Sequence, residues 1–453
     1  MNRRLHLMGA GGVGMCGLAE VLLADGFLVT GCDLELSDRT RRLEELGGVV
    51  RRGHDPSHLD GVDVLVVSSA VDPANPEVAA ALQSGVPVAR RAEMLAELMR
   101  GQRGVAVAGT HGKTTTTALI GHLLDAAGLE PTVVVGGRVR SFGAHGRRGA
   151  GDVMVCEADE YDRSFLELSP QVAVITNLEP EHLDCYDGPE DLEAAFALFA
   201  NRVSPYGLVV ACADDPGVRA LAPRLRRRIA WYGCDCEADL RVTRIEADPD
   251  GTRFTVEGRR GVLGTVFLPL AGRHNVSNAL AAMAAGIELG VSFDRLSAAC
   301  ADFAGVARRF QVLGELNGVT VVDDYAHHPT ELRAALAAAR QAMPGRRLVA
   351  VFQPHLFSRT RDFAAGFGEA LLAADTAIVL PIYAAREKPI DGVDSELVVA
   401  ETRAQGHQEV ISVDSLEAAV KVLTEVVTPG AVVLTMGAGD VHRVAELWLE
   451  GAG

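Results

Sequence analysis

A short apolar run that leads into a glycine turn constrains the fold of this 453-residue chain more than any other feature. Residues 105–117 read Val-Ala-Val-Ala-Gly-Thr-His-Gly-Lys-Thr-Thr-Thr-Thr. This pattern predicts a strand from Val105 to Ala108, then a turn, then a helix that runs to about Ala127 and stops at Gly128. A strand, a turn and a helix in this order are typical of a parallel α/β domain whose helix start binds an anion.

Lys113 is the residue of this segment that points to a nucleotide. The chain has 43 basic residues, of which only Lys113, Lys388 and Lys421 are lysines. A compact ammonium can reach the β- and γ-phosphates, and the Thr114 hydroxyl can bind Mg²⁺. The usual phosphate loop would have a glycine where this chain has Val107, so we interpret the loop as a shortened variant. The alternative is a threonine-rich helix start with a chance lysine.

The composition favours a globular protein of about three domains, at roughly 150 residues each. The net charge of −17 argues against nucleic acid or an anionic membrane as the main partner. We find no apolar run of 18 residues and no hydrophobic leader, so we expect a cytoplasmic protein. The eight cysteines lack the paired spacing of a zinc site and are expected to be reduced and structural.

Alternating strand and helix patterns predict an α/β protein of three domains, with boundaries at 1–100, 101–308 and 309–453. The first and third domains are expected to be Rossmann-like. The central domain is expected to have a parallel sheet of the P-loop ATPase type. Between residues 240 and 270 a period-two alternation, broken by a turn at 248–251, predicts a small antiparallel extension of that sheet.

Residues 9–14, Gly-Ala-Gly-Gly-Val-Gly, form a second phosphate-binding pattern directly after a predicted strand. Asp33 ends the next strand, 19 residues after Gly14, near the position of a ribose-binding acid. Alone, this motif would suggest an NAD-dependent dehydrogenase, or merely a tightly packed turn. Because the same helix start can bind the pyrophosphate of a UDP-sugar, two phosphate loops favour ATP plus a second phosphorylated ligand.

Acids and histidines follow two further strands of the central domain. Glu157 comes after one of them and His182 after the next, and both are candidates for a second metal near the nucleotide. The alternative is that these are solvated surface loops. His274 and Asn275 could bind a purine edge or could cap the helix that begins there, and spacing does not decide between the two.

The third domain places two polar motifs after adjacent strands, at 323–329 and 353–361. Their side chains suit the recognition of a carboxylate and an amine: Tyr325, His327, His328, His355 and Arg359. A Ser-His-Asp hydrolase could be assembled from the same inventory, but the chain has no G-x-S-x-G nucleophile elbow.

With these motifs, the chain resembles the Mur ligase family over nearly its whole length, and in particular its alanine-adding members. The resemblance rests on residues 9–19, 109–115, 157–160, 181–184, 274–275, 323–331 and 353–355. It implies a UDP-sugar domain, a central ATPase domain and a C-terminal domain that carries the amino acid. The implied substrates are ATP, UDP-N-acetylmuramate and L-alanine, which react with Mg²⁺ through an acyl phosphate in peptidoglycan precursor synthesis.

The resemblance also implies roles for individual residues. Catalysis is assigned to Lys113, Glu157, His182 and His327, and metal binding to Thr114, Glu157 and His182. Residues expected at ATP are Gly109, Thr110, His111, Gly112, Lys113, Thr114, Thr115, His274, Asn275, Arg309 and Asp324. Residues expected at the other substrates are Gly11, Gly12, Gly14, Met15, Asp33, Tyr325, His327, His355 and Arg359.

Two departures from the family pattern qualify these assignments. Leu356 stands where some relatives have an arginine, so Arg359 is left as the expected carboxylate clamp. No lysine follows His182 closely enough to act as the carbamoylated lysine of other members. A dehydrogenase and a non-catalytic nucleotide switch remain the alternatives, and the choice among L-alanine, glycine and L-serine stays open. We expect a monomer or a weak homodimer.

Overall fold

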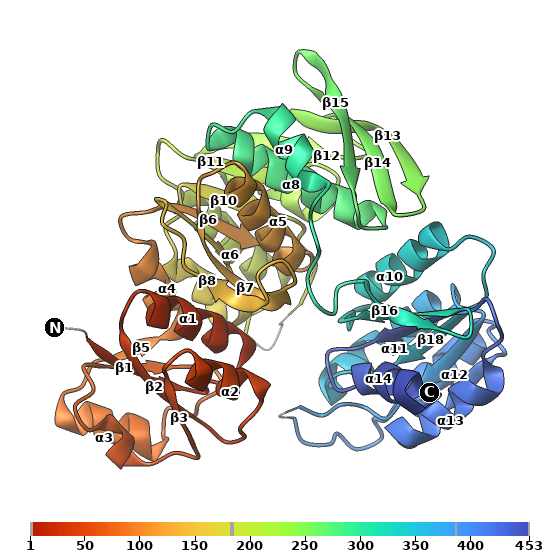
Figure 1. The fold of residues 1–453 in the computed structure, drawn as a ribbon, viewed down its shortest axis with the longest axis horizontal. Coiled ribbons are helices and arrows are strands. Elements are labelled where there is room, and N and C mark those ends of the chain that lie inside the picture. The colour runs from red at the N-terminus through yellow and green to blue at the C-terminus, as the bar shows by residue number, and fades with distance from the viewer. Residues whose placement is uncertain (1–2, 182–184, 386, 452–453) are drawn as a thin grey trace. The chain divides into compact units, whose positions relative to one another are not determined.

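The computed structural model describes residues 3–181, 185–385 and 387–451, and its strands form three sheets (Figure 1). The chain divides into two compact units. The first consists of Met1–Arg244, Phe254–Phe267 and Ser277–Val306, and the second of Ile245–Arg253, Leu268–Val276 and Ala307–Gly453. The predicted three-domain α/β fold is confirmed, with one sheet in each domain.

The first sheet has five parallel strands in the order β3-β2-β1-β4-β5. Its strands are β1 (Arg4–Met8), β2 (Leu28–Asp33), β3 (Val49–Arg52), β4 (Val64–Val67) and β5 (Val88–Arg90). Its helices are α1 (Val13–Ala24), α2 (Asp38–Glu45), η1 (Pro56–Leu59), α3 (Pro76–Ser84) and α4 (Arg91–Met99). Side chains alternate between the faces of β1, so Leu5 and Leu7 pack with α1 while Met8 packs on the opposite face with α3.

The second sheet has ten strands in the order β15-β14-β13-β12-β11-β10-β6-β9-β7-β8. The strands are β6 (Arg103–Ala108), β7 (Thr132–Val139), β8 (Ala144–Arg147), β9 (Val153–Glu157), β10 (Val172–Ile175), β11 (Leu208–Cys212), β12 (Arg228–Gly233), β13 (Leu240–Asp248), β14 (Gly251–Gly258) and β15 (Gly261–Leu268). The helices are α5 (Lys113–Ala126), η2 (Tyr161–Glu167), α6 (Pro189–Asn201), α7 (Pro216–Leu221), η3 (Ala222–Arg224), α8 (Arg273–Glu288) and α9 (Phe293–Cys300).

The third sheet has six strands in the order β16-β17-β21-β18-β19-β20. The strands are β16 (Gln311–Leu316), β17 (Val319–Asp324), β18 (Leu348–Phe352), β19 (Thr376–Val379), β20 (Val410–Ser412) and β21 (Val432–Met436). The helices are α10 (Pro329–Ala342), α11 (Phe357–Leu371), α12 (Glu396–Ala404), α13 (Leu416–Val426) and α14 (His442–Gly451). Its central strands β17, β21 and β18 are mostly apolar, and helices cover both faces of the sheet.

The structure corrects the sequence-based elements in two places. The extension at residues 240–268 has three strands rather than two, because a second tight turn joins β14 to β15 (Figure 1). The sheets of the central and C-terminal domains are not purely parallel, since β8 pairs antiparallel with β7 and β16 pairs antiparallel with β17. Both extra strands are edge strands of exposed or mixed pattern, and their short apolar stretches gave no periodic signal.

The predicted helix after the glycine turn is confirmed as α5, and Gly128 ends it with a left-handed φ of 76°. The N–H of Gly128 bonds the carbonyl of Asp125, and that of Leu129 bonds the carbonyl of Leu124. This arrangement satisfies carbonyls that the helix end would otherwise leave without partners. Within the described residues, no helix is long and apolar enough to cross a membrane.

The helix α1 of the first sheet packs on β7 and β8 of the second sheet, within the same compact unit. The Glu20 carboxylate accepts hydrogen bonds from the backbone N–H groups of His145 and Gly146, at 2.8 and 2.6 Å. An added Cβ at Gly146 would lie 2.0 Å from the carbonyl oxygen of Gly17. Glycines therefore allow the two backbones to come this close, and Glu20 holds them together.

A substitution of Gly109 tests how closely the nucleotide loop packs against Thr176. Its φ is 130°, and an added Cβ would lie 2.0 Å from Thr176 Oγ1. Gly290 has a φ of 90° but open space at the Cβ position, so it is a matched control for backbone strain alone. We expect Gly109→Ala to lower the free energy of unfolding by about 1–3 kcal/mol more than Gly290→Ala does, measured by urea unfolding. Equal losses would show that the loop is not tightly packed.

Candidate site for a nucleotide and a carboxylate substrate

The glycine loop between β6 and α5 is held by the segment that follows the neighbouring strand β10. Asn177 Oδ1 accepts a hydrogen bond from the backbone N–H of His111 at 2.7 Å, and Asn177 Nδ2 donates to the His111 carbonyl at 3.1 Å. Thr176 Oγ1 also donates to the His111 carbonyl, at 2.6 Å. The N–H and C=O groups of a sharply turned loop are thereby satisfied without a regular ladder. Asn177 was not among the residues predicted from the sequence, although it directly follows the strand β10 and Thr176.

Lys113 lies over this loop rather than extending into solvent. Its Nζ donates to the Gly109 carbonyl at 2.6 Å and contacts both carboxylate oxygens of Glu160 at 2.9 Å. Glu160 is 1% exposed and lies at the N-cap of η2. Its backbone carbonyl accepts a hydrogen bond from the Tyr186 hydroxyl. Glu160 therefore positions the ammonium at the mouth of the loop.

The charges around Lys113 keep its ammonium protonated. Burial alone would lower the pKa of Lys113, but the nearby carboxylates of Glu160 and Asp159 outweigh burial and raise it above its ordinary value. Burial in turn raises the pKa of Glu160, against the attraction of Lys113. A fixed positive charge at a helix start, beside oriented N–H groups, is the arrangement that binds a phosphate.

Hard oxygen donors lie on the same side of the loop. Thr114 begins the helix beside Lys113 and is 6% exposed, and Glu157 ends β9. Both are adjacent to a glycine pair in β7: a Cβ on Gly136 would lie 2.8 Å from Glu157 Oε2, and one on Gly137 would lie 2.9 Å from Thr114 Cγ2. Thr114 turns its methyl group toward Gly137, and its hydroxyl and the Glu157 carboxylate are oxygen groups of the kind that Mg²⁺ prefers. His182, the other predicted metal ligand, lies outside the described residues.

The glycine loop after β1 is hydrogen-bonded to Asp33, the acid predicted to act with it. Asp33 Oδ2 accepts a hydrogen bond from the Gly11 N–H at 2.8 Å, and a Cβ on Gly11 would lie 2.9 Å from this oxygen. Two arginines that the sequence analysis did not consider are also at this loop. Arg39 donates to the Gly11 carbonyl, and the side chain of Arg91 would meet a Cβ on Gly14 at 3.3 Å. Their guanidinium groups add positive charge where a pyrophosphate is expected. Gly12, at the α1 N-cap, and Met15, 2% exposed inside α1, complete the predicted set.

His274 and Asn275 are both in the first turn of α8. Asn275 Nδ2 donates to the Ala271 carbonyl at 2.7 Å, and the Asn275 N–H bonds the Gly272 carbonyl. The side chain of Asn275 thus stabilises the start of the helix, which is the structural alternative left open by the sequence. Burial and the nearby charge of Arg309 lower the pKa of His274 to about 4, so its imidazole is neutral at pH 7.

In the C-terminal domain, the structure brings together the four side chains predicted at the amino acid. The rings of Tyr325 and His327 have centroids 5.4 Å apart, and those of His327 and His355 are 5.9 Å apart. Arg359, 9% exposed at the start of α11, places Nη1 3.2 Å from His355 Nδ1. His327 Nδ1 faces the Tyr325 carbonyl at 2.9 Å. Because a carbonyl oxygen can only accept, Nδ1 carries the proton in this contact, and in a neutral imidazole the lone pair is then on Nε2. Glu331 Oε2 also lies 3.2 Å from Nδ1.

Two residues of the predicted C-terminal motifs have structural contacts instead. His328 is the N-cap of α10, where Nδ1 accepts from the Thr330 N–H at 3.4 Å. Gln353 donates to Asp440 Oδ1 at 2.8 Å and accepts from the Val441 N–H at 3.1 Å, which ties β18 to the segment after β21. Leu356 begins α11 with a left-handed φ of 68°, a strained conformation for this residue type.

Asp324 and Arg309 belong to the same unit as this cluster. Asp324 accepts hydrogen bonds from the backbone N–H groups of Phe310 and Ala326, at 2.7 and 2.8 Å. Arg309 lies over the Tyr325 ring, with its Cζ 5.2 Å from the ring centroid. Burial raises the pKa of Asp324 to about 6, although the Arg309 charge and the two N–H groups act in the opposite direction.

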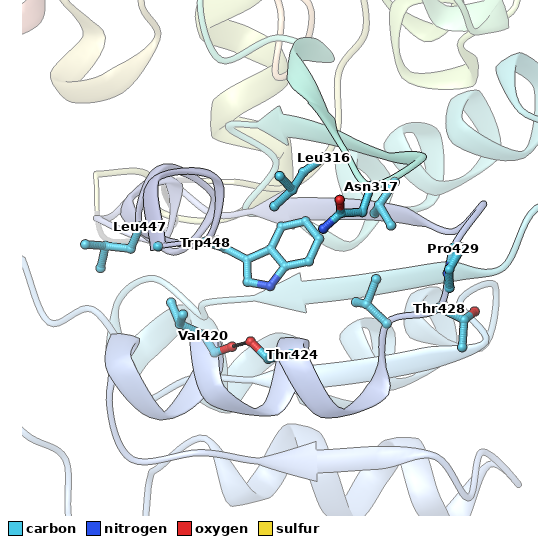
Figure 2. Close-up of a pocket in the computed structure, with 11 residues that line it drawn as sticks. Leu316, Asn317, Val420, Thr424, Thr428, Pro429, Leu447 and Trp448 are labelled. Carbon is cyan, nitrogen blue, oxygen red and sulfur yellow. Dashed lines mark hydrogen bonds between the residues drawn. The ribbon is translucent and has the colours of Figure 1, made fainter. Parts of the chain in front are cut away.

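A cavity of about 330 Å³ lies elsewhere in the C-terminal domain and contains none of the predicted site residues (Figure 2). It is lined by Leu316 at the end of β16, by Asn317 of the following turn, by α13, and by Trp448 of α14. Its walls are mostly aliphatic, with Asn317, Thr424 and Thr428 as polar side chains and, among the described residues, no charged one. A charged substrate would find no opposite charge in this cavity.

The family of this chain follows from its similarity to known proteins. A protein of Desulfatibacillum aliphaticivorans named UDP-N-acetylmuramate–L-alanine ligase is 46% identical over 445 residues, 98% of each chain. A protein of the same name from Anaeromyxobacter sp. is 50% identical over 438 residues, 97% of this chain and 95% of its own length. The chain belongs to the Mur ligase family.

Family models and solved structures agree with this assignment along the whole Mur ligase. The models match as the Mur ligase family catalytic domain at 4–103, the Mur ligase middle domain at 107–286 and the glutamate ligase domain at 308–439. The crystal structure of UDP-N-acetylmuramate–alanine ligase from Thermotoga maritima superposes with a TM-score of 0.85 at 29% identity, covering 99% of this chain and 98% of its own. The predicted family and enzyme class are confirmed.

Removing the Lys113 ammonium should abolish most nucleotide-dependent turnover of this Mur ligase. We expect Lys113→Ala to reduce kcat for ADP release by roughly 10²–10³, the loss typical of one preorganised electrostatic contact. Lys421, exposed on α13 in the other compact unit, is the matched control, and Lys421→Ala should keep the original rate. A fully active Lys113→Ala enzyme would remove the glycine loop from the mechanism.

Asp324 should make stability depend on pH. Its pKa is about 6 in the folded chain and about 3.9 when unfolded. Between these values the folded state binds more protons, so the free energy of unfolding contributed by Asp324 falls as pH rises. Between pH 5 and pH 8, we expect the free energy of unfolding of the original protein to fall by about 1–2 kcal/mol relative to that of Asp324→Asn. Urea unfolding at each pH measures this difference. Parallel pH profiles for the two proteins would contradict this.

Proposed function

We propose that this Mur ligase joins L-alanine to the carboxylate of UDP-N-acetylmuramate and converts ATP to ADP and phosphate. The observation that carries the proposal is the 46–50% identity, over nearly the full length, to ligases named for these two substrates. Lys113 over a phosphate loop supports the ATP half of the reaction, and the cluster around His327 and Arg359 supports the amino-acid half. The product would be a precursor of peptidoglycan.

Each proposed domain has one substrate. Residues 1–100 would bind the UDP-sugar at the loop that contains Gly11, Gly12 and Gly14, and at Asp33. Residues 101–308 would bind ATP on the loop from Gly109 to Thr115. Residues 309–453 would bind L-alanine. This order is supported by the position of these groups, which follow parallel strands, where open α/β sheets bind their ligands.

The chemistry requires activation of a poor electrophile. A substrate carboxylate oxygen would attack the γ-phosphorus of ATP, ADP would leave, and an acyl phosphate would result. The amine of L-alanine would then attack the acyl carbon and expel phosphate, with loss of a proton from nitrogen. Holding two anions close together is the main obstacle, so fixed positive charge and correct orientation supply most of the acceleration.

The residues of the central domain would manage this charge. Lys113 would contact the β- and γ-phosphates from the mouth of the loop, with Glu160 orienting its ammonium. Thr114 would hold Mg²⁺, and Glu157 with His182 would hold a second ion; when bound, these ions would neutralise phosphate charge. The backbone N–H groups of residues 112–115 would orient the phosphate oxygens.

The residues of the C-terminal domain would hold the amine and the carboxylate of L-alanine. His327 Nε2 carries the lone pair, because Nδ1 donates to the Tyr325 carbonyl, so Nε2 would accept the proton from the amine. Arg359 would pair with the alanine carboxylate, and its contact with His355 limits the directions in which the guanidinium can turn. With Leu356 at the helix start, Arg359 would be the arginine for this carboxylate.

An ADP-release assay tests the proposed reaction. ADP should form rapidly only when both UDP-N-acetylmuramate and L-alanine are present, because phosphate leaves only when an acyl phosphate forms and is consumed. We expect kcat/KM for L-alanine to exceed that for glycine by roughly 10–200-fold, the range for one methyl group in a fitted pocket. L-Serine completes the panel. Equal ADP release without the UDP-sugar would contradict the ligase and favour a simple ATPase.

A further inference from the structure

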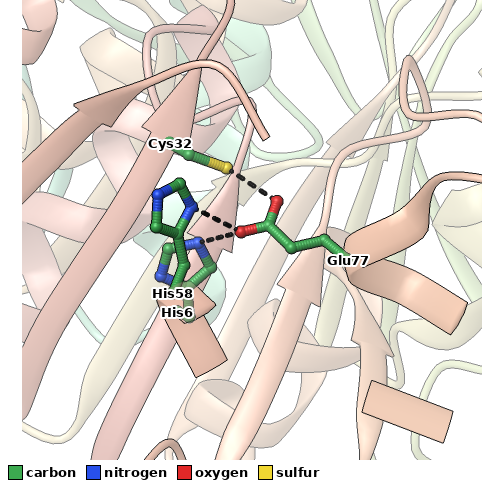
Figure 3. Close-up of side chains that lie close together, drawn as sticks. All are labelled: His6, Cys32, His58 and Glu77. Atoms are coloured by element: carbon green, nitrogen blue, oxygen red, sulfur yellow. Dashed lines mark hydrogen bonds and ion pairs between the residues drawn. The ribbon is translucent and has the colours of Figure 1, made fainter. Parts of the chain in front are cut away.

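A buried cluster of metal-type ligands lies in the N-terminal domain, apart from the residues proposed for the ligase reaction (Figure 3). It contains His6 of β1, Cys32 of β2, His58 of η1 and Glu77 of α3. One nitrogen, sulfur or carboxylate oxygen from each residue lies within 4.8 Å of the others. Four different elements therefore contribute one donor each to a single point.

Glu77 is the centre of the cluster and has no exposed surface. Its Oε1 lies 3.2 Å from His6 Nε2 and 2.7 Å from His58 Nδ1, and its Oε2 lies 3.2 Å from Cys32 Sγ. His54 approaches from the edge, with Nδ1 3.1 Å from Oε2. Burial alone would raise the pKa of Glu77, but the contacts from His6 and Cys32 outweigh burial and lower it to about 2. The group is therefore a carboxylate and not a neutral acid.

This environment is unusual for the face of a parallel sheet. The same face otherwise packs Met8, Leu65, Val78 and Ala81 in a small apolar core. A buried carboxylate needs strong compensation in such a core. His6 Nε2 is buried yet meets the geometry of a hydrogen bond with no described residue, although Glu77 Oε1 is only 3.2 Å away. This arrangement of His6 Nε2 and Glu77 Oε1 is better explained if both atoms are ligands of one cation than if they form a hydrogen-bonded pair.

We propose that His6, Cys32, His58 and Glu77 bind one divalent transition-metal ion of the zinc type. Two imidazoles, one thiolate and one carboxylate form a four-donor set that Zn²⁺ accepts in tetrahedral sites. Donors at about 2.0–2.3 Å from a tetrahedral ion lie roughly 3.3–3.8 Å apart. The observed contacts to Glu77 are 2.7–3.2 Å, and the four donor atoms all lie within 4.8 Å of one another, so shifts of up to roughly 1 Å would place them around the ion.

The surroundings of the cluster support a metal in two further ways. Thr30 Oγ1 lies 2.8 Å from His6 Nδ1, so a hydroxyl on the neighbouring strand orients the imidazole with Nε2 toward Glu77. Partners of this kind are typical of metal-bound histidines. In the arrangement described, Cys32 donates its thiol proton to Glu77, and a bound ion would replace this proton. The resulting thiolate and carboxylate balance the two positive charges of the ion.

A cavity lies beside two of the four proposed ligands, His6 and His58. This cavity, of about 320 Å³, is lined by His6, Thr30 and His58 together with polar residues of the η1 segment. Arg4 and Arg51 also line it, so the thiolate and carboxylate ligands, rather than a generally acidic mouth, must attract the cation. Ser57 and Asp60 line the same cavity and offer oxygen atoms along its wall.

Cobalt titration of the full-length chain tests the proposal. After treatment with a chelator, the protein should bind one equivalent of Co²⁺ and develop a near-ultraviolet thiolate-to-cobalt charge-transfer band. The proposed Mg²⁺ ligands contain no sulfur, so cobalt bound there would give no such band. Cys32→Ser should abolish the band, and Zn²⁺ should raise the thermal unfolding midpoint of the original chain but not of Cys32→Ser. A chain without the band, or a Cys32→Ser variant that keeps it, would overturn the proposal.

Matched variants separate ligand loss from misfolding. Cys300→Ser changes another buried thiol, and the double variant Cys234→Ser/Cys236→Ser removes the only closely spaced pair of cysteines; both should keep the band. His58→Ala removes a ligand near the cavity mouth and should lower zinc affinity by at least the roughly 10–100-fold that loss of a ligand's hydrogen-bond partner costs. Thr30→Val should lower zinc affinity by roughly 10–100-fold and should keep the cobalt band. If His58→Ala binds zinc with unchanged affinity, the cluster is a hydrogen-bonded network around Glu77 and not a metal site.

Discussion

The close approach between the glycine loop and the segment after β10 is the constraint on which the central domain depends. Gly109 has no side chain, so its Cα can lie against Thr176, and Asn177 can then bond both backbone groups of His111. These bonds fix the direction in which α5 begins. Because Lys113 is the first residue of that helix, its ammonium is brought over the loop by the same contacts.

The strongly negative net charge of the chain does not conflict with the binding of anionic substrates. Positive groups are concentrated at strand ends: Lys113 after β6, Arg39 and Arg91 at the loop after β1, and Arg359 after β18. Lys113, Arg39 and Arg359 are each held by a carbonyl, a carboxylate or an imidazole, so their positions are determined before a substrate arrives. Fixed charge of this kind stabilises developing negative charge without the cost of reorganisation. Net charge excludes classes of partner, whereas local geometry determines which ligand binds.

Motifs that follow apolar strands could be predicted from the sequence because strand and function are encoded in one continuous segment. The strand and helix around Lys113, the helix end at Gly128 and the grouping of Tyr325, His327, His355 and Arg359 were all predictable in this way. The edge strands β8 and β16 were not, since short strands with mixed patterns carry little periodicity. His328 and Gln353 belong to the same motifs as site residues, and only coordinates show that their polar atoms bond the backbone or Asp440.

The cluster around Glu77 could not be predicted from spacing, because its four donors come from separate elements and share no local pattern. Its position nevertheless connects it to the glycine loop. Cys32 and Asp33 are consecutive in β2, and consecutive side chains of a strand point to opposite sides. Cys32 contacts Glu77, while Asp33 accepts from the Gly11 N–H. An ion bound to Cys32 would therefore restrain the strand end that carries Asp33, and a structural metal would stiffen the loop proposed for the UDP-sugar without touching that substrate.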